Sequence, residues 1–181
     1  MNLETEVALV EAILFLEAEP IDLGSLQRIT QLPRDVVLDA LAQLRENLGT
    51  PDHGLELVEI AEGYALAPKQ DLAPALRERY GKKNDAKLSR AAMETLSIIA
   101  YSQPITRAEI ENLRGVNADG MMRVLLGRNL IREVGRKDSP GKPVQYGTTK
   151  EFLKLFRLST IADLPKLDEA DRKRFARDEE E

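Results

Sequence analysis

The segment from Gly135 to Lys142 combines glycines, basic residues and a serine, a mixture that can cradle a phosphate group. A phosphate-binding loop needs four residues between its glycines and a Ser or Thr directly after its lysine. Here five residues separate Gly135 from Gly141, and Pro143 follows Lys142. The segment also falls between two predicted strands, whereas such a loop joins a strand to a helix. The spacing therefore argues against a nucleotide site.

Side chains suited to catalysis or metal binding are few in this chain. Cysteine is absent, and the one histidine, His53, stands in a Pro-Asp-His-Gly turn where a solvated side chain is far commoner than a ligand or base. Glu109 and Glu111 are two residues apart on a predicted helix, so their carboxylates do not face each other. These observations predict no metal, no cofactor and no enzymatic activity.

A basic cluster lies on or beside a predicted hairpin, where Arg136, Lys137 and Lys142 could contact phosphates. The helix before that hairpin offers Asn117 and Arg123 as base readers, but Asp119 opposes them beside a phosphate backbone. A DNA-binding regulator therefore stays open as an alternative. A protein-binding adaptor is the reading that we favour.

Charge is divided unevenly along the 181 residues, whose net charge is −5. Residues 1–80 carry 6 Lys/Arg and 15 Asp/Glu, whereas residues 88–157 carry 12 and 7. An acidic half joined to a basic half indicates distinct partners, contact between unlike halves of neighbouring molecules, or simply two differently charged solvated surfaces.

The elements that would position these side chains form one pattern that occurs twice. Three short amphipathic helices precede a hairpin, with residues 55–67 forming the first hairpin and residues 131–148 the second. Each half repeats an apolar helix, a Pro-Ile pair (residues 20–21 and 104–105) and two further segments. The pattern predicts a mainly α protein with small β hairpins (α+β), built as two tandem winged-helix domains joined by a polar linker.

Periodicity and capping residues give specific expectations for each helix. The apolar residues expected to face inward are Leu3, Val7, Val10, Leu14, Leu23, Leu26, Ile29, Val37, Leu41, Leu44, Leu48, Ala92, Leu96, Ile99, Ala100, Met121, Val124, Leu125, Leu130, Phe152, Leu155 and Phe156. Ile13 and Leu16 widen the apolar face of the first helix beyond what one small core needs. The expected caps are Asp22, Ser89, Thr106 with Glu109, Asn117, and Thr148 with Glu151. We expect Glu62-Gly63 to form the first hairpin turn.

These elements divide the chain into four parts. The predicted parts are an N-terminal domain (1–80), a linker (81–87), a C-terminal domain (88–158) and a charged, disordered tail (159–181). The first residues lack a basic-then-apolar leader, and no apolar run is long enough to cross a bilayer. We expect a cytoplasmic protein with no membrane contact.

From Glu94 onward the chain resembles the bacterial family of segregation and condensation protein B (ScpB). The stretches that carry the resemblance are 94–101 (ETLSIIAY), 103–107 (QPITR), 114–120 (RGVNADG), 135–138 (GRKD) and 146–149 (YGTT). The first half agrees more loosely, through residues 11–15 and 54–59. Two departures are mild: Ser102 and Lys142 stand where the family often has arginine.

The resemblance implies a non-enzymatic homodimer, formed through the N-terminal domains, that binds the kleisin ScpA through its C-terminal domains. ScpA would link it to the ATPase SMC in chromosome condensation and partition during cell division, so that it reaches DNA through the complex and is associated with the nucleoid. By motif position, the residues expected near the partner are Tyr101, Arg114, Asn117, Asp119, Arg136 and Tyr146. Each of them could equally serve the fold alone.

Overall fold

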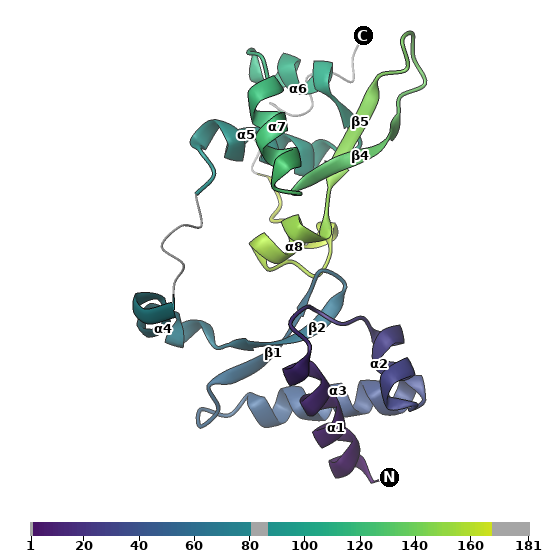
Figure 1. The fold of residues 1–181 in the computed structure, drawn as a ribbon, viewed down its shortest axis with the longest axis vertical. Helices are drawn as coiled ribbons and strands as arrows, with labels where there is room; N and C mark the ends of the chain where they lie inside the picture. The colour runs from purple at the N-terminus through teal and green to yellow at the C-terminus, as the bar shows by residue number, and fades with distance from the viewer. Residues whose placement is uncertain (1, 81–86, 168–181) are drawn as a thin grey trace. The chain divides into compact units, whose positions relative to one another are not determined.

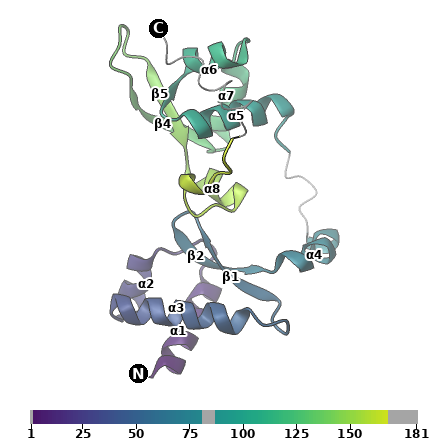
Figure 2. The same cartoon turned by 180° about the vertical axis from the view of Figure 1, so that it is seen from behind.

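The computed structural model describes residues 2–80 and 87–167, which form two compact units (Figures 1 and 2). Both units combine helices with a small antiparallel sheet, so the expectation of an α+β fold is confirmed. Most of the predicted linker and the tail from residue 168 lie outside the described residues. Within the described ranges, no helix is both long enough and apolar enough to cross a membrane.

The first unit begins with three α-helices that lead into a two-stranded antiparallel sheet (Figure 1). Its elements are α1 (Leu3–Leu16), α2 (Leu23–Thr30), α3 (Arg34–Leu48), β1 (Leu55–Ile60), β2 (Gly63–Pro68), η1 (Gln70–Leu72) and α4 (Ala73–Tyr80). Asp22 caps α2 as predicted, because its side chain accepts a hydrogen bond from the Ser25 N–H at 2.9 Å. Pro33 directly precedes α3, where its missing N–H has no cost.

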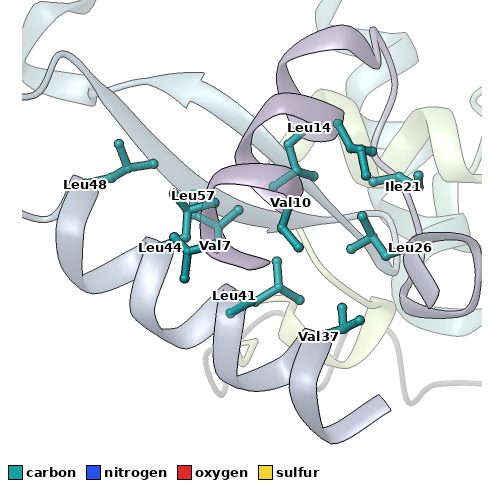
Figure 3. Packing of buried hydrophobic residues seen from close by; sticks show 12 residues of the cluster. Val7, Val10, Leu14, Ile21, Leu26, Val37, Leu41, Leu44, Leu48 and Leu57 are labelled. Carbon is teal, nitrogen blue, oxygen red and sulfur yellow. The ribbon is translucent and has the colours of Figure 1, made fainter. Parts of the chain in front are cut away.

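The core of the first unit lies between α1, α2, α3 and β1 (Figure 3). The predicted stripe of α3 is confirmed in full, since Val37, Leu41, Leu44 and Leu48 are all buried. Other helices are less regular than their periodicity implied. The residues expected inward that are instead well exposed are Leu3 (43 %) and Ile29 (48 %). The first and last turns of a short helix extend past a core this small, so their apolar residues reach solvent.

The first hairpin turns one residue earlier than predicted. Ala61 and Glu62 both have positive φ, at 53° and 64°, and Gly63 already begins β2. Gly63 is needed for another reason: a Cβ there would lie 3.0 Å from the Pro20 carbonyl carbon and 3.1 Å from the Ile21 nitrogen. The glycine therefore allows the α1–α2 connection to approach the hairpin closely.

The second unit repeats this order with additions (Figure 2). Its elements are α5 (Arg90–Ser102), β3 (Ile105–Thr106), α6 (Arg107–Arg114), α7 (Asp119–Gly127), β4 (Ile131–Arg136), β5 (Val144–Thr148), α8 (Lys150–Phe156) and η2 (Ile161–Asp163). The strands form an antiparallel sheet in the order β3-β5-β4. Ser89 caps α5, and Thr106 with Glu109 forms the predicted capping box on α6.

Two predicted faces in the second unit are rotated by one residue. In α7 the buried residues are Met122 and Leu125, whereas Val124 is 41 % exposed. In α8 the buried pair is Phe152 and Leu153, so Leu155 and Phe156 are exposed in place of the inward position predicted for them. Where apolar residues are adjacent in the sequence, two overlapping helical faces fit the same periodicity. Packing against other elements selects which of the two faces is buried.

Two predicted caps are also displaced. Asn117 accepts a hydrogen bond from the Asp119 N–H at 3.1 Å, although the residue at the N-cap of α7 is Ala118. Thr149, and not Thr148, caps α8, and Glu151 pairs with Lys154.

The Pro-Ile repeat occupies the same position in both units. Ile21 forms a bridge with Tyr64 of β2, and Ile105 pairs with Tyr146 of β5. In each case the next residue caps the following helix. The similarity seen in the sequence therefore extends to backbone pairing.

The prediction of a disordered tail from residue 159 is wrong for residues 159–167. Thr160 and Asp163 form a capping box around η2, and the Tyr101 hydroxyl donates to the Pro165 carbonyl at 2.8 Å. This segment returns from α8 to α5, although it contains few large apolar residues.

Candidate partner-binding site

Arg114 ends α6 and is almost completely buried, with its side chain only 6 % exposed. Its Nη1 donates to the Asn117 carbonyl at 3.3 Å, and its Nη2 lies 3.9 Å from Glu94 Oε2 on α5. Its Nε has no hydrogen-bond partner among the described residues. Arg114 therefore ties the α6–α7 turn to α5, and its guanidinium is not presented at the surface.

Asn117 and Asp119 belong to the same turn and are linked to the start of α6. Asp119 forms an ion pair with Arg107, whose Nε also donates to Glu111 Oε1 at 3.1 Å. Glu111 Oε1 accepts the Ala118 N–H at 3.0 Å. The predicted partner-binding residues 114, 117 and 119 are thus brought together, but they are joined to their own chain.

The electrostatics of this network favour its charged form. The hydrogen bond from the Ala118 backbone, with that from Arg107, lowers the pKa of Glu111. The hydrogen bond that Arg107 donates to Glu111 raises the pKa of Arg107. The network therefore stabilises the α6–α7 turn over the neutral pH range.

Arg136 and Tyr146 lie on the β4–β5 hairpin, where they are exposed and half-buried respectively. Arg136 Nη1 donates to the Lys142 carbonyl at 3.1 Å, across the base of the hairpin loop. Tyr146 pairs in register with Ile105 on one side and Glu133 on the other. Both residues therefore contribute to the hairpin, and Arg136 keeps an exposed side chain.

Lys137 makes a long-range contact that the sequence did not indicate. Its Nζ lies 2.5 Å from Glu109 Oε1, which joins the hairpin to the capping box of α6. Burial raises the pKa of Glu109, but the hydrogen bonds from Lys137 and Thr106 outweigh burial and leave that pKa below its ordinary value. Of the three residues proposed for phosphate contact, Lys137 is thus already neutralised by a carboxylate.

Tyr101, at the end of α5, is the remaining predicted residue. Its hydroxyl donates to Pro165 in the segment that follows α8. That segment contributes to the surface around Tyr101, and sequence reasoning missed it because no apolar pattern marks it.

The outward face of α1 exposes two large apolar side chains. Phe15 is 74 % exposed and Leu16 is 80 % exposed, and Ala12 and Ala8 lie exposed one and two turns earlier. Ile13, expected to widen this face, is instead buried. Beside it, a shallow cavity of about 790 Å³ opens between α1 and α3 and is lined by Leu3, Val7, Ala8, Glu11, Gln43 and Asn47, among others.

The structure offers no constellation for metal chemistry within residues 2–80 and 87–167, where no cluster of three His, Asp or Glu side chains could hold an ion. His53 is exposed in the turn between α3 and β1.

Comparison with known proteins adds the family. A family model described as segregation and condensation complex subunit ScpB matches residues 8–167. Segregation and condensation protein B of Desulforamulus reducens is 43 % identical over 166 residues, which cover 92 % of this chain and 91 % of that protein.

Two solved structures are also similar. ScpB from Mycobacterium tuberculosis is 34 % identical, with 87 % of this chain and 98 % of that chain covered and a TM-score of 0.43. A dimer of an ScpB N-terminal domain complexed with an ScpA peptide is 26 % identical, covering 42 % and 95 %, with a TM-score of 0.40. The match to the family model spans most of the sequence and shows the family. The chain belongs to the ScpB family of segregation and condensation complex subunits.

Proposed function

We propose that this chain is a non-enzymatic, dimeric subunit of an SMC–kleisin complex that acts in chromosome condensation and partition. The family match over residues 8–167 carries this proposal. In this role the chain binds the kleisin ScpA and reaches SMC and DNA only through the complex. It works in the cytoplasm, associated with the nucleoid.

Each unit serves this role as a winged-helix domain, and the two domains are joined by the polar linker. The order of three helices and a hairpin, found in both units, supports this assignment. So does the equivalent pairing of Ile21 with Tyr64 and of Ile105 with Tyr146. Winged helices commonly use a helix or the hairpin wing as a contact surface, which suits a binding subunit.

The outward face of α1 forms the dimer contact. A symmetric contact needs one surface patch that is complementary to itself. Ala8 and Ala12 allow close approach of a second helix, and Phe15 and Leu16 supply apolar area that is exposed in the single chain. Burial of this area offsets the cost of association.

The second unit binds ScpA, with Tyr101, Arg114, Asn117, Asp119, Arg136 and Tyr146 lying at or supporting that surface. Arg136 and Tyr146 are accessible on the hairpin. Arg114, Asn117 and Asp119 act indirectly, because their polar groups hold the α6–α7 turn.

Co-purification of the full chain with ScpA and SMC, with the stoichiometry measured, tests the proposal. We expect two copies of this chain for each ScpA. Sedimentation of the chain alone should show a dimer at micromolar concentration, and the double variant Phe15→Glu/Leu16→Glu should be a monomer. The control Leu38→Glu changes a partly exposed residue of α3 and should stay dimeric. A chain that retains no ScpA would contradict the proposed function.

A winged-helix transcription regulator is the alternative, and the described contacts weaken it. Lys137 is paired with Glu109, and Asn117, one of the two candidate base readers, is engaged within the α6–α7 turn, whereas Arg123 stays exposed. This alternative predicts salt-sensitive, sequence-dependent DNA binding that the triple variant Arg136→Gln/Lys137→Gln/Lys142→Gln abolishes.

A further inference from the structure

The outward face of α7 is a surface that the predicted binding residues do not include. The helical period places Gly120, Arg123, Val124 and Gly127 on one side of α7, and all four are exposed. Met122 and Leu125 point the opposite way into the core. The turn that begins α7 is held by the Arg114 and Asp119 contacts described above, so this face is presented by an ordered segment.

Two glycines leave part of the helix backbone on this face uncovered. A Cβ added at Gly120 or at Gly127 would meet no atom within 4 Å, so packing inside the described unit does not require glycine at either position. Glycine destabilises a helix relative to alanine, and its use where space is free suits close approach of another backbone. On the helical face, these glycines fall between the directions of Arg123 and Val124.

Two valines of this segment are also exposed. Val124 is 41 % exposed, and Val116, in the turn that precedes α7, is 57 % exposed. Sequence reasoning missed this face, because it placed Val124 in the core.

The segment that runs from this face into β4 is rich in arginine. From Arg123 to Arg136 the chain has four arginines and one acidic residue, Glu133. Within the described part of the chain, neither Arg123 nor Arg132 forms an ion pair. In contrast, five acids of this unit pair with cations inside it: Glu94, Glu109, Glu111, Asp119 and Glu151. The α7–β4 region therefore attracts a negatively charged partner.

We infer that the outward face of α7 binds an acidic polypeptide segment that carries apolar side chains. Its carboxylates would pair with Arg123 and Arg132, and its apolar side chains would cover Val124 and Val116. An acidic polypeptide fits better than nucleic acid, because a phosphate backbone leaves the exposed valines uncovered. This inference rests on the proposed function, since the segment is taken to belong to ScpA.

The test measures binding of purified full-length ScpA to the full chain by isothermal titration calorimetry. Arg123→Glu reverses the charge of the side chain at position 123. Gly120→Phe places a ring on the uncovered backbone, where the chain itself leaves space. Each change should weaken binding about tenfold or more, the loss typical of a central interface residue. The matched control Arg90→Glu should bind ScpA as the parent does, and Gly120→Ala, which adds a single methyl group, should weaken binding less than Gly120→Phe does. Thermal melting of every variant verifies that each one folds.

The outcomes separate this inference from the proposed function. If the parent binds ScpA and the folded Arg123→Glu and Gly120→Phe variants bind equally well, the α7 surface is wrong and the proposed function stands. If the parent does not bind ScpA, both fall. If instead a short DNA duplex binds the parent and Arg123→Glu removes that binding while ScpA binding persists, the face serves nucleic acid and the inference is overturned.

Discussion

The two units share an order of elements but stabilise it in different ways. The first unit depends on a continuous aliphatic cluster, and its ion pair between Arg45 and Glu59 spans 4.0 Å at the surface. The second unit adds a polar network that links α5, α6, α7 and the hairpin through Arg107, Arg114 and Lys137. A repeated fold can therefore keep its backbone pairing while one copy comes to depend on charged contacts.

Truncation of a large side chain in the aliphatic core of the first unit should have the strongest effect. Leu44 is fully buried in α3, so Leu44→Ala should lower the free energy of unfolding of the first unit by about 2–5 kcal/mol. Urea unfolding followed by hydrogen exchange should show lost amide protection within residues 2–80. The partly exposed Leu38 provides the matched control, and Leu38→Ala should cost far less. Equal loss of protection in both units would show that the cores are not independent.

Substitution of Arg114 tests the polar network of the second unit. Arg114→Ala leaves the Asn117 carbonyl and Glu94 without this partner, and we expect a cost of about 1–3 kcal/mol in the second unit. Thermal unfolding measures the change. Arg90→Ala alters an exposed arginine at the start of α5 and should stay within about 0.5 kcal/mol of the parent. A neutral Arg114→Ala would mean that the network adds nothing to stability.

The equivalent helix caps allow a direct comparison of the two copies. Asp22→Ala and Thr106→Ala each remove an N-cap and should cost about 1 kcal/mol. Thr106→Ala should cost more, because Thr106 is buried and also donates to Glu109 at 2.7 Å. Chemical denaturation of both variants gives the ranking. The reverse order would refute the idea that the second copy depends more on polar contacts.

The smallest effect is a pH dependence. In the folded protein, hydrogen bonds hold the pKa of Glu111 and of Glu109 below the ordinary value of 4.5, with burial opposing them at Glu109. The unfolded chain therefore binds more protons below that value. This stabilisation is fully present above pH 4.5 and is lost as the pH falls through the folded pKa values.

A substitution isolates one of these carboxylates. Glu109→Gln should reduce the acid sensitivity of melting, whereas Glu133→Gln, at an exposed position of β4, should leave it unchanged. An identical acid slope in the parent and in Glu109→Gln would rule out this contribution.

Much of the fold could be predicted from local sequence, and the reason is physical. The α3 stripe and the caps at Asp22, Ser89 and Thr106 depend on residues within one or two helical turns, so their spacing is visible in the sequence. The inward face of α7 could not be fixed in this way. Met121 and Met122, like Val124 and Leu125, are adjacent apolar residues, and only contact with other elements selects Met122 and Leu125.

The candidate site was harder to predict than the fold. The burial of Arg114 depends on Glu94, twenty residues earlier, and the position of Lys137 depends on Glu109. Such partners meet only after the chain folds, so no local pattern encodes them. The motif therefore indicated which residues share one turn but not the contacts that their side chains make.

The contact between Tyr101 and Pro165 bears on how the second unit can be produced by itself. A fragment that stops at residue 158, where the large apolar residues become sparse, would lack η2 and the carbonyl that receives the Tyr101 hydroxyl. A fragment extended to residue 167 retains both. We expect the longer version to give the more stable isolated domain, so domain boundaries for expression are better placed by this return segment than by hydrophobicity.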